Sequence, residues 1–147
     1  MDTLFQRVAP LSQERIIEAL KRMDVVYHVD SAGDLGMFFN ECVIWFDIAG
    51  TDEDVLMIHA DPFRDIPMEE IMPFRKFINY WNATSFWPRV YPSINDDGIV
   101  RAHCDHAVNC INGITDAQLE ANIVLFISMI RDFYTELDKK ESMAGNE

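Results

Sequence analysis

The chain has 147 residues, of which 49% are hydrophobic and 25% are charged, and these values are typical of one globular domain. Its 25 acidic residues outnumber its 12 lysines and arginines, which gives a formal net charge of −13. This imbalance argues against a nucleic-acid binder and against attachment to an anionic membrane surface, because both need lysine and arginine to pair with phosphates.

The cysteines and the apolar segments indicate the compartment. The three cysteines, Cys42, Cys104 and Cys110, form an odd and sparse set that favours free thiols in a reducing cytoplasm. The start of the chain lacks the pattern of a signal peptide, and the unbroken apolar runs are shorter than the roughly 20 residues that a spanning helix needs. We therefore expect a cytoplasmic protein without a membrane segment.

The first 60 residues predict one helix and then several strands. Ser12 is a good N-cap, and apolar residues recur with helical spacing from there to Met23. Strands rich in β-branched and aromatic residues follow at 25–30, 36–40, 43–48 and 55–60. The segment 43–48 is apolar on both of its faces, so we expect a central strand that is covered on both sides.

The rest of the chain predicts two helices that flank a pair of strands. A helix is expected over 68–84, and strands over 88–94 and 98–106 are joined by a turn at Asp97-Gly98, a strong hairpin signal. The last helix begins with a capping box, in which Thr115 and Gln118 satisfy each other's backbone N–H groups. Its apolar stripe is wider than packing on one sheet face requires, which indicates a surface for a partner.

These elements predict an α+β fold in the order α-β-β-β-(β)-α-β-β-α, with a mainly antiparallel sheet and segregated helices. Residues 1–137 are expected to form a single domain, and residues 138–147 a polar, flexible tail.

The most metal-like cluster is His103-Cys104-Asp105-His106, with Cys110 nearby. Because side chains alternate along a strand, His103 and Asp105 should face one way and Cys104 and His106 the other, so they would not converge on one ion. A metal or thiol site here is the less favoured alternative. The chain shows no phosphate-binding loop and no hydrolase motif, and we predict neither a catalytic residue nor a cofactor.

Three sets of residues are candidates for binding. Aromatic residues gather around the end of the second helix, and the last helix carries apolar residues beyond its core stripe. The aromatic candidates are Trp81, Phe86, Trp87 and Tyr91, and the candidates for a dimer or partner surface are Leu125, Met129 and Phe133.

The third set is acidic. Nine acidic residues and no lysine or arginine lie between Asp24 and Asp61, and three of the nine, Asp52, Glu53 and Asp54, are consecutive. An acidic face of this kind would attract basic partner segments, or it would only keep the protein soluble.

An ordered set of short motifs extends over residues 11–137: Tyr27-His28-Val29-Asp30, Gly33, Gly36, Trp45-Phe46, Trp81-Asn82, Trp87-Pro88-Arg89-Val90-Tyr91, Gly98, Gly113-Ile114-Thr115 and Gln118-Leu119. This ordered set resembles the YbjN-type domain family, whose members are described as bacterial sensory transduction regulators. His103 departs from the family pattern, in which an acidic residue is expected. The resemblance implies a fold similar to type III secretion chaperones, dimerisation and protein binding, with no known catalytic residue or cofactor.

The sequence thus favours a non-enzymatic protein-binding or regulatory module, chaperone-like and homodimeric, with protein partners that include basic segments. A small-ligand sensor is the main alternative, with a pocket between the second helix and the sheet lined by Trp45, Phe74 and Trp81.

Overall fold

The computed structural model describes residues 6–145, with side chains described through Lys140. The elements of this part of the chain are α1 (Gln13–Arg22), β1 (His28–Val29), β2 (Leu35–Phe39), β3 (Cys42–Ala49), β4 (Val55–Pro62), the 3-10 helix η1 (Met68–Glu70), α2 (Ile71–Thr84), β5 (Arg89–Ile94), β6 (Val100–Asn109) and α3 (Asp116–Gly145). Their order confirms the predicted α+β class.

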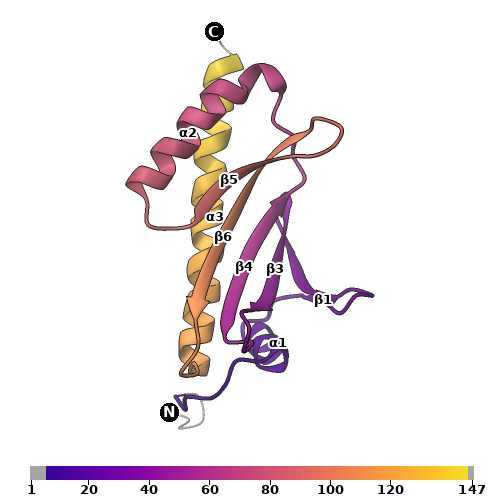
Figure 1. Ribbon diagram of the computed structural model, residues 1–147, viewed down its shortest axis with the longest axis vertical. Helices are drawn as coiled ribbons and strands as arrows, with labels where there is room; N and C mark the ends of the chain where they lie inside the picture. The colour runs from indigo at the N-terminus through magenta and orange to yellow at the C-terminus, as the bar shows by residue number, and fades with distance from the viewer. Residues whose placement is uncertain (1–5, 146–147) are drawn as a thin grey trace.

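The strands form one antiparallel sheet in the order β1-β2-β3-β4-β6-β5. Consecutive strands are hairpin neighbours, except that α2 intervenes between β4 and β5, so that β4 pairs with β6 and leaves β5 at the edge. The α3 helix runs along the length of the sheet, while α1 lies at the lower end and α2 at the upper end (Figure 1).

The signals that start the helices are the ones expected. The Ser12 hydroxyl accepts a hydrogen bond from the backbone N–H of Arg15 at the start of α1. At the start of α3, the N–H of Thr115 donates to the Gln118 side chain and the N–H of Gln118 donates to the Thr115 hydroxyl, both at 3.0 Å. Both helix starts were therefore readable from local sequence.

The core lies on one face of the sheet. Ile44 of β3, Ile58 of β4 and Cys104 of β6 are fully buried there, together with Ile16 of α1 and Phe126 of α3. Along β4, buried residues alternate with half-buried ones, as expected for a strand with one covered face. The other face, which we call the open face, carries Trp45, Asp47, His59, Asp61, Tyr91, His103 and Asp105.

Three expectations about the elements need correction. The β3 strand is central, but coverage on both sides is wrong, because Trp45 and Asp47 are half-buried on the open face and contact His28 and His59. The strand expected over 25–30 is reduced to the two residues of β1. The last helix continues to Gly145, through most of the stretch expected to be a tail, and residues 146–147 lie outside the described part.

Candidate binding surfaces

The open face carries a chain of polar side chains that crosses four strands. His59 Nε2 lies 2.7 Å from Asp47 Oδ2, and His59 Nδ1 lies 3.7 Å from Asp61 Oδ1. The same Asp61 oxygen is 2.9 Å from His103 Nδ1, and His103 Nε2 is 2.5 Å from the Ser93 hydroxyl. Since these residues come from β3, β4, β6 and β5, the chain braces the sheet across its strands.

The electrostatics of this polar chain centre on Asp61. Its hydrogen bond with His103, followed by its contact with His59, holds the pKa of the Asp61 carboxyl well below its usual range, although burial acts in the opposite direction. The pKa of His59 is raised, chiefly by Asp61 and further by Asp47, while burial of the ring lowers it. Both shifts favour a charged pair in the folded state.

The order Ser93–His103–Asp61 also places a hydroxyl, an imidazole and a carboxylate as in hydrolytic triads. Acyl transfer needs, in addition, a substrate site and donors aimed at the developing oxyanion. Ser93 lies opposite Arg101 in the regularly paired β5–β6 ladder, and not on a turn or loop of the kind that presents a nucleophile to a substrate. We therefore interpret this arrangement as a cross-strand brace.

The brace predicts a defined pH dependence, which Asp61→Asn should remove in large part. A depressed Asp61 pKa adds stability above about pH 4, which is lost as the pH falls through the folded pKa. A raised His59 pKa adds stability below about pH 6.5, which is lost as the pH rises through the folded pKa. The brace should therefore contribute most between these two values.

In Asp61→Asn, the NMR titration midpoint of His59 should fall, because its main stabilising charge is gone. Urea unfolding between about pH 3 and 8 should show a flatter stability profile than the wild type. Asp65→Asn is the matched control, because Asp65 pairs with Arg101 and does not belong to the brace. An unchanged His59 midpoint in Asp61→Asn would contradict the assignment.

The metal-like cluster His103-Cys104-Asp105-His106 is divided between the two faces of β6, as the alternation of side chains along a strand predicted. His103 lies on the open face, whereas Cys104 and His106 are buried on the covered face, where His106 Nε2 approaches Asn122 Oδ1 at 3.3 Å. Burial raises the pKa of the Cys104 thiol well above its usual value, so that this thiol stays protonated. Within the described residues, no group of three or more His, Cys, Asp or Glu side chains is arranged to hold a metal ion.

The four aromatic candidates do not form one surface. Trp81 is half-buried and donates from Nε1 to the Pro88 carbonyl, and Tyr91 stacks on His103 on the open face. Phe86 and Trp87 are exposed, at 93% and 47%, with ring centroids 5.9 Å apart. Only this exposed pair keeps the character of a partner-facing aromatic site.

The three candidates on α3 differ in how far they are exposed. Phe133 is 0% exposed and packs on α2, so its assignment to a partner surface is wrong. Leu125 is exposed and Met129 is half-buried, whereas Val124, which is not among the predicted candidates, is more exposed than either, at 55%. Val124 lies next to Leu125 and three residues after Ala121, a helical spacing that could have identified it.

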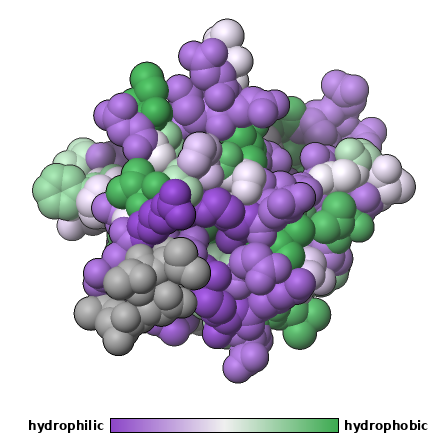
Figure 2. Space-filling view, turned by 90° about the horizontal axis from the view of Figure 1, so that it is seen from below, coloured by the Kyte–Doolittle hydropathy of each residue, from purple (hydrophilic) through white to green (hydrophobic). Residues whose placement is uncertain are grey.

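The acidic candidates lie at the lower end of the molecule. Asp52 and Glu53 are exposed in the turn between β3 and β4, and Asp54 is half-buried. Together with residues 8–11 and 110–113, they line an open cavity of about 670 Å³, which also includes the exposed side chains of Val8 and Ile111. Figure 2 views this end and shows a mainly hydrophilic surface with separate hydrophobic patches.

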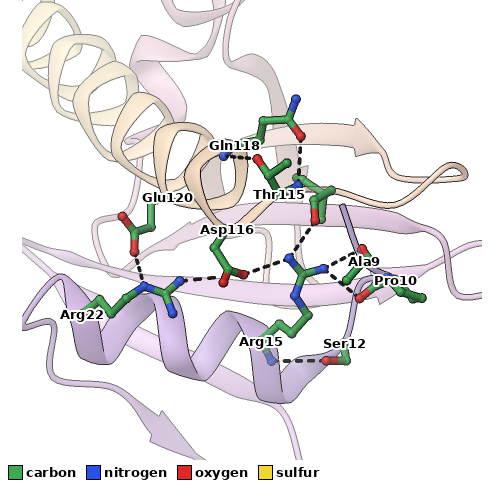
Figure 3. A network of polar contacts seen from close by, with 10 residues as sticks. Ala9, Pro10, Ser12, Arg15, Arg22, Thr115, Asp116, Gln118 and Glu120 are labelled. Atoms are coloured by element: carbon green, nitrogen blue, oxygen red, sulfur yellow. Dashed lines mark hydrogen bonds and ion pairs between the residues drawn. The ribbon is translucent and has the colours of Figure 1, made fainter. Parts of the chain in front are cut away.

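Arg15 holds the two chain segments that form one side of this cavity. Its guanidinium donates to the carbonyls of Ala9, Pro10 and Ile114 and pairs with Asp116 at 2.8 Å (Figure 3). A short antiparallel bridge between Ala9 and Ile114 joins the same segments. The acidic turn thus faces a wall that is fixed by one arginine of α1.

The prediction of a ligand pocket between the second helix and the sheet, lined by Trp45, Phe74 and Trp81, is wrong. Trp45 lies on the open face, whereas Phe74 and Trp81 belong to the core side, so the three cannot line one pocket. On the core side, Phe74 lines a small cavity of about 90 Å³ with residues of α2 and α3.

The fold and its surfaces define a small α+β domain built on a single antiparallel sheet. Residues 12–139 match the family model YbjN, described as "Putative bacterial sensory transduction regulator", and the chain therefore belongs to the YbjN family. No curated protein sequence matches. Within the described residues, no helix has both the length and the apolar character needed to cross a membrane.

A solved structure supports the same fold. The chain is similar to a protein described as "YbjN, a putative transcription regulator from E. coli", with a TM-score of 0.71 and 14% sequence identity. The match covers 84% of this chain and 91% of that chain. At this level of identity, the similarity shows the fold alone.

Proposed function

We propose that the chain is a non-enzymatic regulatory module that binds a basic segment of another protein, in a chaperone-like way, and acts as a homodimer. The observation that carries this proposal is the cavity at the lower end, which combines Asp52, Glu53 and Asp54 with exposed Val8 and Ile111. The family description, which names a regulator, supports it. The net charge of −13 favours a protein partner over DNA.

The chemistry of the partner follows from the two kinds of side chain in the cavity. Three carboxylates attract lysine and arginine, and an exposed valine and isoleucine offer apolar contacts to a neighbouring side chain. The segment from Asp24 to Asp61, which includes this turn, contains nine acids and no lysine or arginine, and its negative charge would speed the encounter with a basic segment. We therefore assign this cavity to a segment of mixed basic and apolar residues.

Reversing the charge of the turn should abolish most of this binding. We expect Asp52→Lys/Glu53→Lys to weaken the binding of a fluorescent peptide of alternating lysine and leucine at least tenfold, measured by anisotropy at low and moderate salt. The matched control is Asp96→Lys/Asp97→Lys, which reverses two exposed acids in the turn between β5 and β6 at the other end of the sheet (Figure 1). Equal losses in both variants would mean that only net charge acts, which would contradict the assignment.

The homodimer is proposed to form through the outer face of α3. Ala121, Val124, Leu125 and Ser128 follow the i, i+3, i+4, i+7 spacing of a helix-packing ridge, and the ten residues 121–130 carry no charge. Val124 and Leu125 are 55% and 39% exposed. Two chains of charge −13 repel each other, so they approach most easily where charge is absent. We therefore assign this ridge to a second copy of the chain.

A charge placed on the ridge should separate the copies. Light scattering should give the wild type twice the chain mass of 17.0 kDa, and Val124→Glu should give the mass of a single chain. Val26→Glu, at a residue that is 89% exposed near β1, should remain dimeric and controls for the added charge. A wild type that scatters as a single chain at high concentration would overturn the homodimer without touching the cavity proposal.

A further inference from the structure

A second cavity lies at the other end of the sheet, where β3 begins and β4 ends beside α3. Its volume is about 470 Å³, within the range of small-molecule sites, and its lining comes from the β2–β3 turn, the end of β4 and α3. Cys42 and Pro62 are buried at its floor, and Phe39 and Tyr134 are half-buried beside them. The floor can therefore take an apolar group of modest size.

The charged residues of this cavity fall into two groups. Arg64 and Asp138 form an ion pair with each other across the wall, from the segment after β4 to α3. Glu41, on the β2–β3 turn, has no hydrogen bond or ion pair with any side chain in the described part of the chain. The polar contact of the Arg131 side chain is a weak 3.5 Å hydrogen bond to Ser128 of the same helix. One carboxylate and one guanidinium, on two walls, thus remain available to a ligand.

We propose that this cavity binds a free α-amino acid with an apolar side chain. Arg131 would receive the carboxylate, for which a guanidinium offers paired donors, and Glu41 would receive the ammonium group. The side chain would rest on the floor formed by Cys42, Pro62 and Tyr134. A simple anion would be repelled by Glu41, and a simple cation would be repelled by Arg131. A zwitterion can pair with both residues at once.

The site holds its ligand by non-covalent contacts. Burial, together with the negative charge of Asp61, raises the pKa of the Cys42 thiol to about 12, so the sulfur stays protonated and unreactive. The Cys42 thiol instead lies 3.1 Å from the Phe39 carbonyl oxygen, to which it donates. This inference is independent of the proposed partner-binding cavity, which lies at the opposite end of the sheet.

Calorimetric titration of the full chain with leucine and with phenylalanine tests the proposal. We expect saturable binding of at least one of them, and at least tenfold weaker binding of leucinamide, which lacks the carboxylate, and of N-acetyl-leucine, which lacks the ammonium group. Arg131→Gln and Glu41→Gln should each weaken binding at least tenfold, whereas Arg75→Gln, an exposed arginine on α2, should not.

Thermal unfolding without ligand separates binding from folding, because Arg131 and Glu41 are exposed and their variants should melt as the wild type does. No saturable heat with either amino acid at about 10 mM would overturn the proposal. Equal binding of N-acetyl-leucine, or full binding by Glu41→Gln, would overturn the zwitterion assignment.

Discussion

Phe133→Ala should lower the free energy of unfolding by about 3–5 kcal/mol, the cost of deleting a fully buried aromatic ring. Phe133 is 0% exposed, stacks on Phe77 with ring centroids 5.6 Å apart, and meets the edge of Trp81 at 5.1 Å. The alanine would leave a cavity at the junction of α2, α3 and the sheet. Urea unfolding followed by circular dichroism measures the loss.

Phe86→Ala is the matched control for this prediction, since it removes the same side chain from a position that is 93% exposed. It should change stability by less than about 0.5 kcal/mol. Phe133→Leu keeps most of the volume and should cost about 1 kcal/mol. If Phe133→Ala unfolded like the wild type but lost the dimer in light scattering, Phe133 would belong to a partner surface after all.

Phe133 shows what the apolar spacing of α3 can predict and what it cannot. The apolar spacing on α3 predicted correctly that Leu119, Ile123, Phe126 and Ile130 are buried. Phe133 was assigned, with Leu125 and Met129, to a partner outside the chain, whereas it packs against Phe77 and Trp81 of α2 within the chain. Which helix lies beside α3 depends on the connection between β4 and β5, a long-range property that local spacing does not contain.

The polar brace could not be predicted from the sequence either, because it also depends on which strands are paired. His59 stood singly in its strand, and His103 was grouped only with its sequence neighbours Cys104, Asp105 and His106. The two histidines are 44 positions apart along the chain, and they meet at Asp61 only because β4 pairs with β6. A shift of one residue in that pairing would turn every side chain to the opposite face. The acidic turn at Asp52, Glu53 and Asp54 could be located, because a turn and its charges are local features.

Arg15→Ala should destabilise the protein by about 2–4 kcal/mol, although the residue lies on a short surface helix. The Arg15 guanidinium donates to three backbone carbonyls at 2.6–2.9 Å and pairs with Asp116 (Figure 3). It joins the segment before α1 to the start of α3, about 100 residues later in the chain. Removing it leaves those carbonyls and the Asp116 carboxylate with fewer donors in a partly buried site.

Two further substitutions, Arg15→Lys and Arg22→Ala, test whether the positive charge of Arg15 or the shape of its guanidinium stabilises the protein. A single ammonium cannot serve carbonyls on two sides, so Arg15→Lys should recover less than half of the loss in urea unfolding. Arg22→Ala, which removes the more exposed ion pair to Glu120 and a long contact of 3.9 Å to Asp116, should cost less than about 1 kcal/mol. An Arg15→Ala variant as stable as Arg22→Ala would contradict the bridging role.

Arg15 also links stability to the proposed binding of a basic segment, because it fixes residues 9, 10 and 114 beside the acidic turn. At a temperature where Arg15→Ala is still folded, the lysine–leucine peptide should bind it more weakly, with the salt dependence of the wild type, since the acids remain. Asp52→Lys/Glu53→Lys should lose both affinity and salt dependence at unchanged stability. The two variants together therefore distinguish a loss of binding caused by displaced cavity residues from a loss caused by missing negative charge.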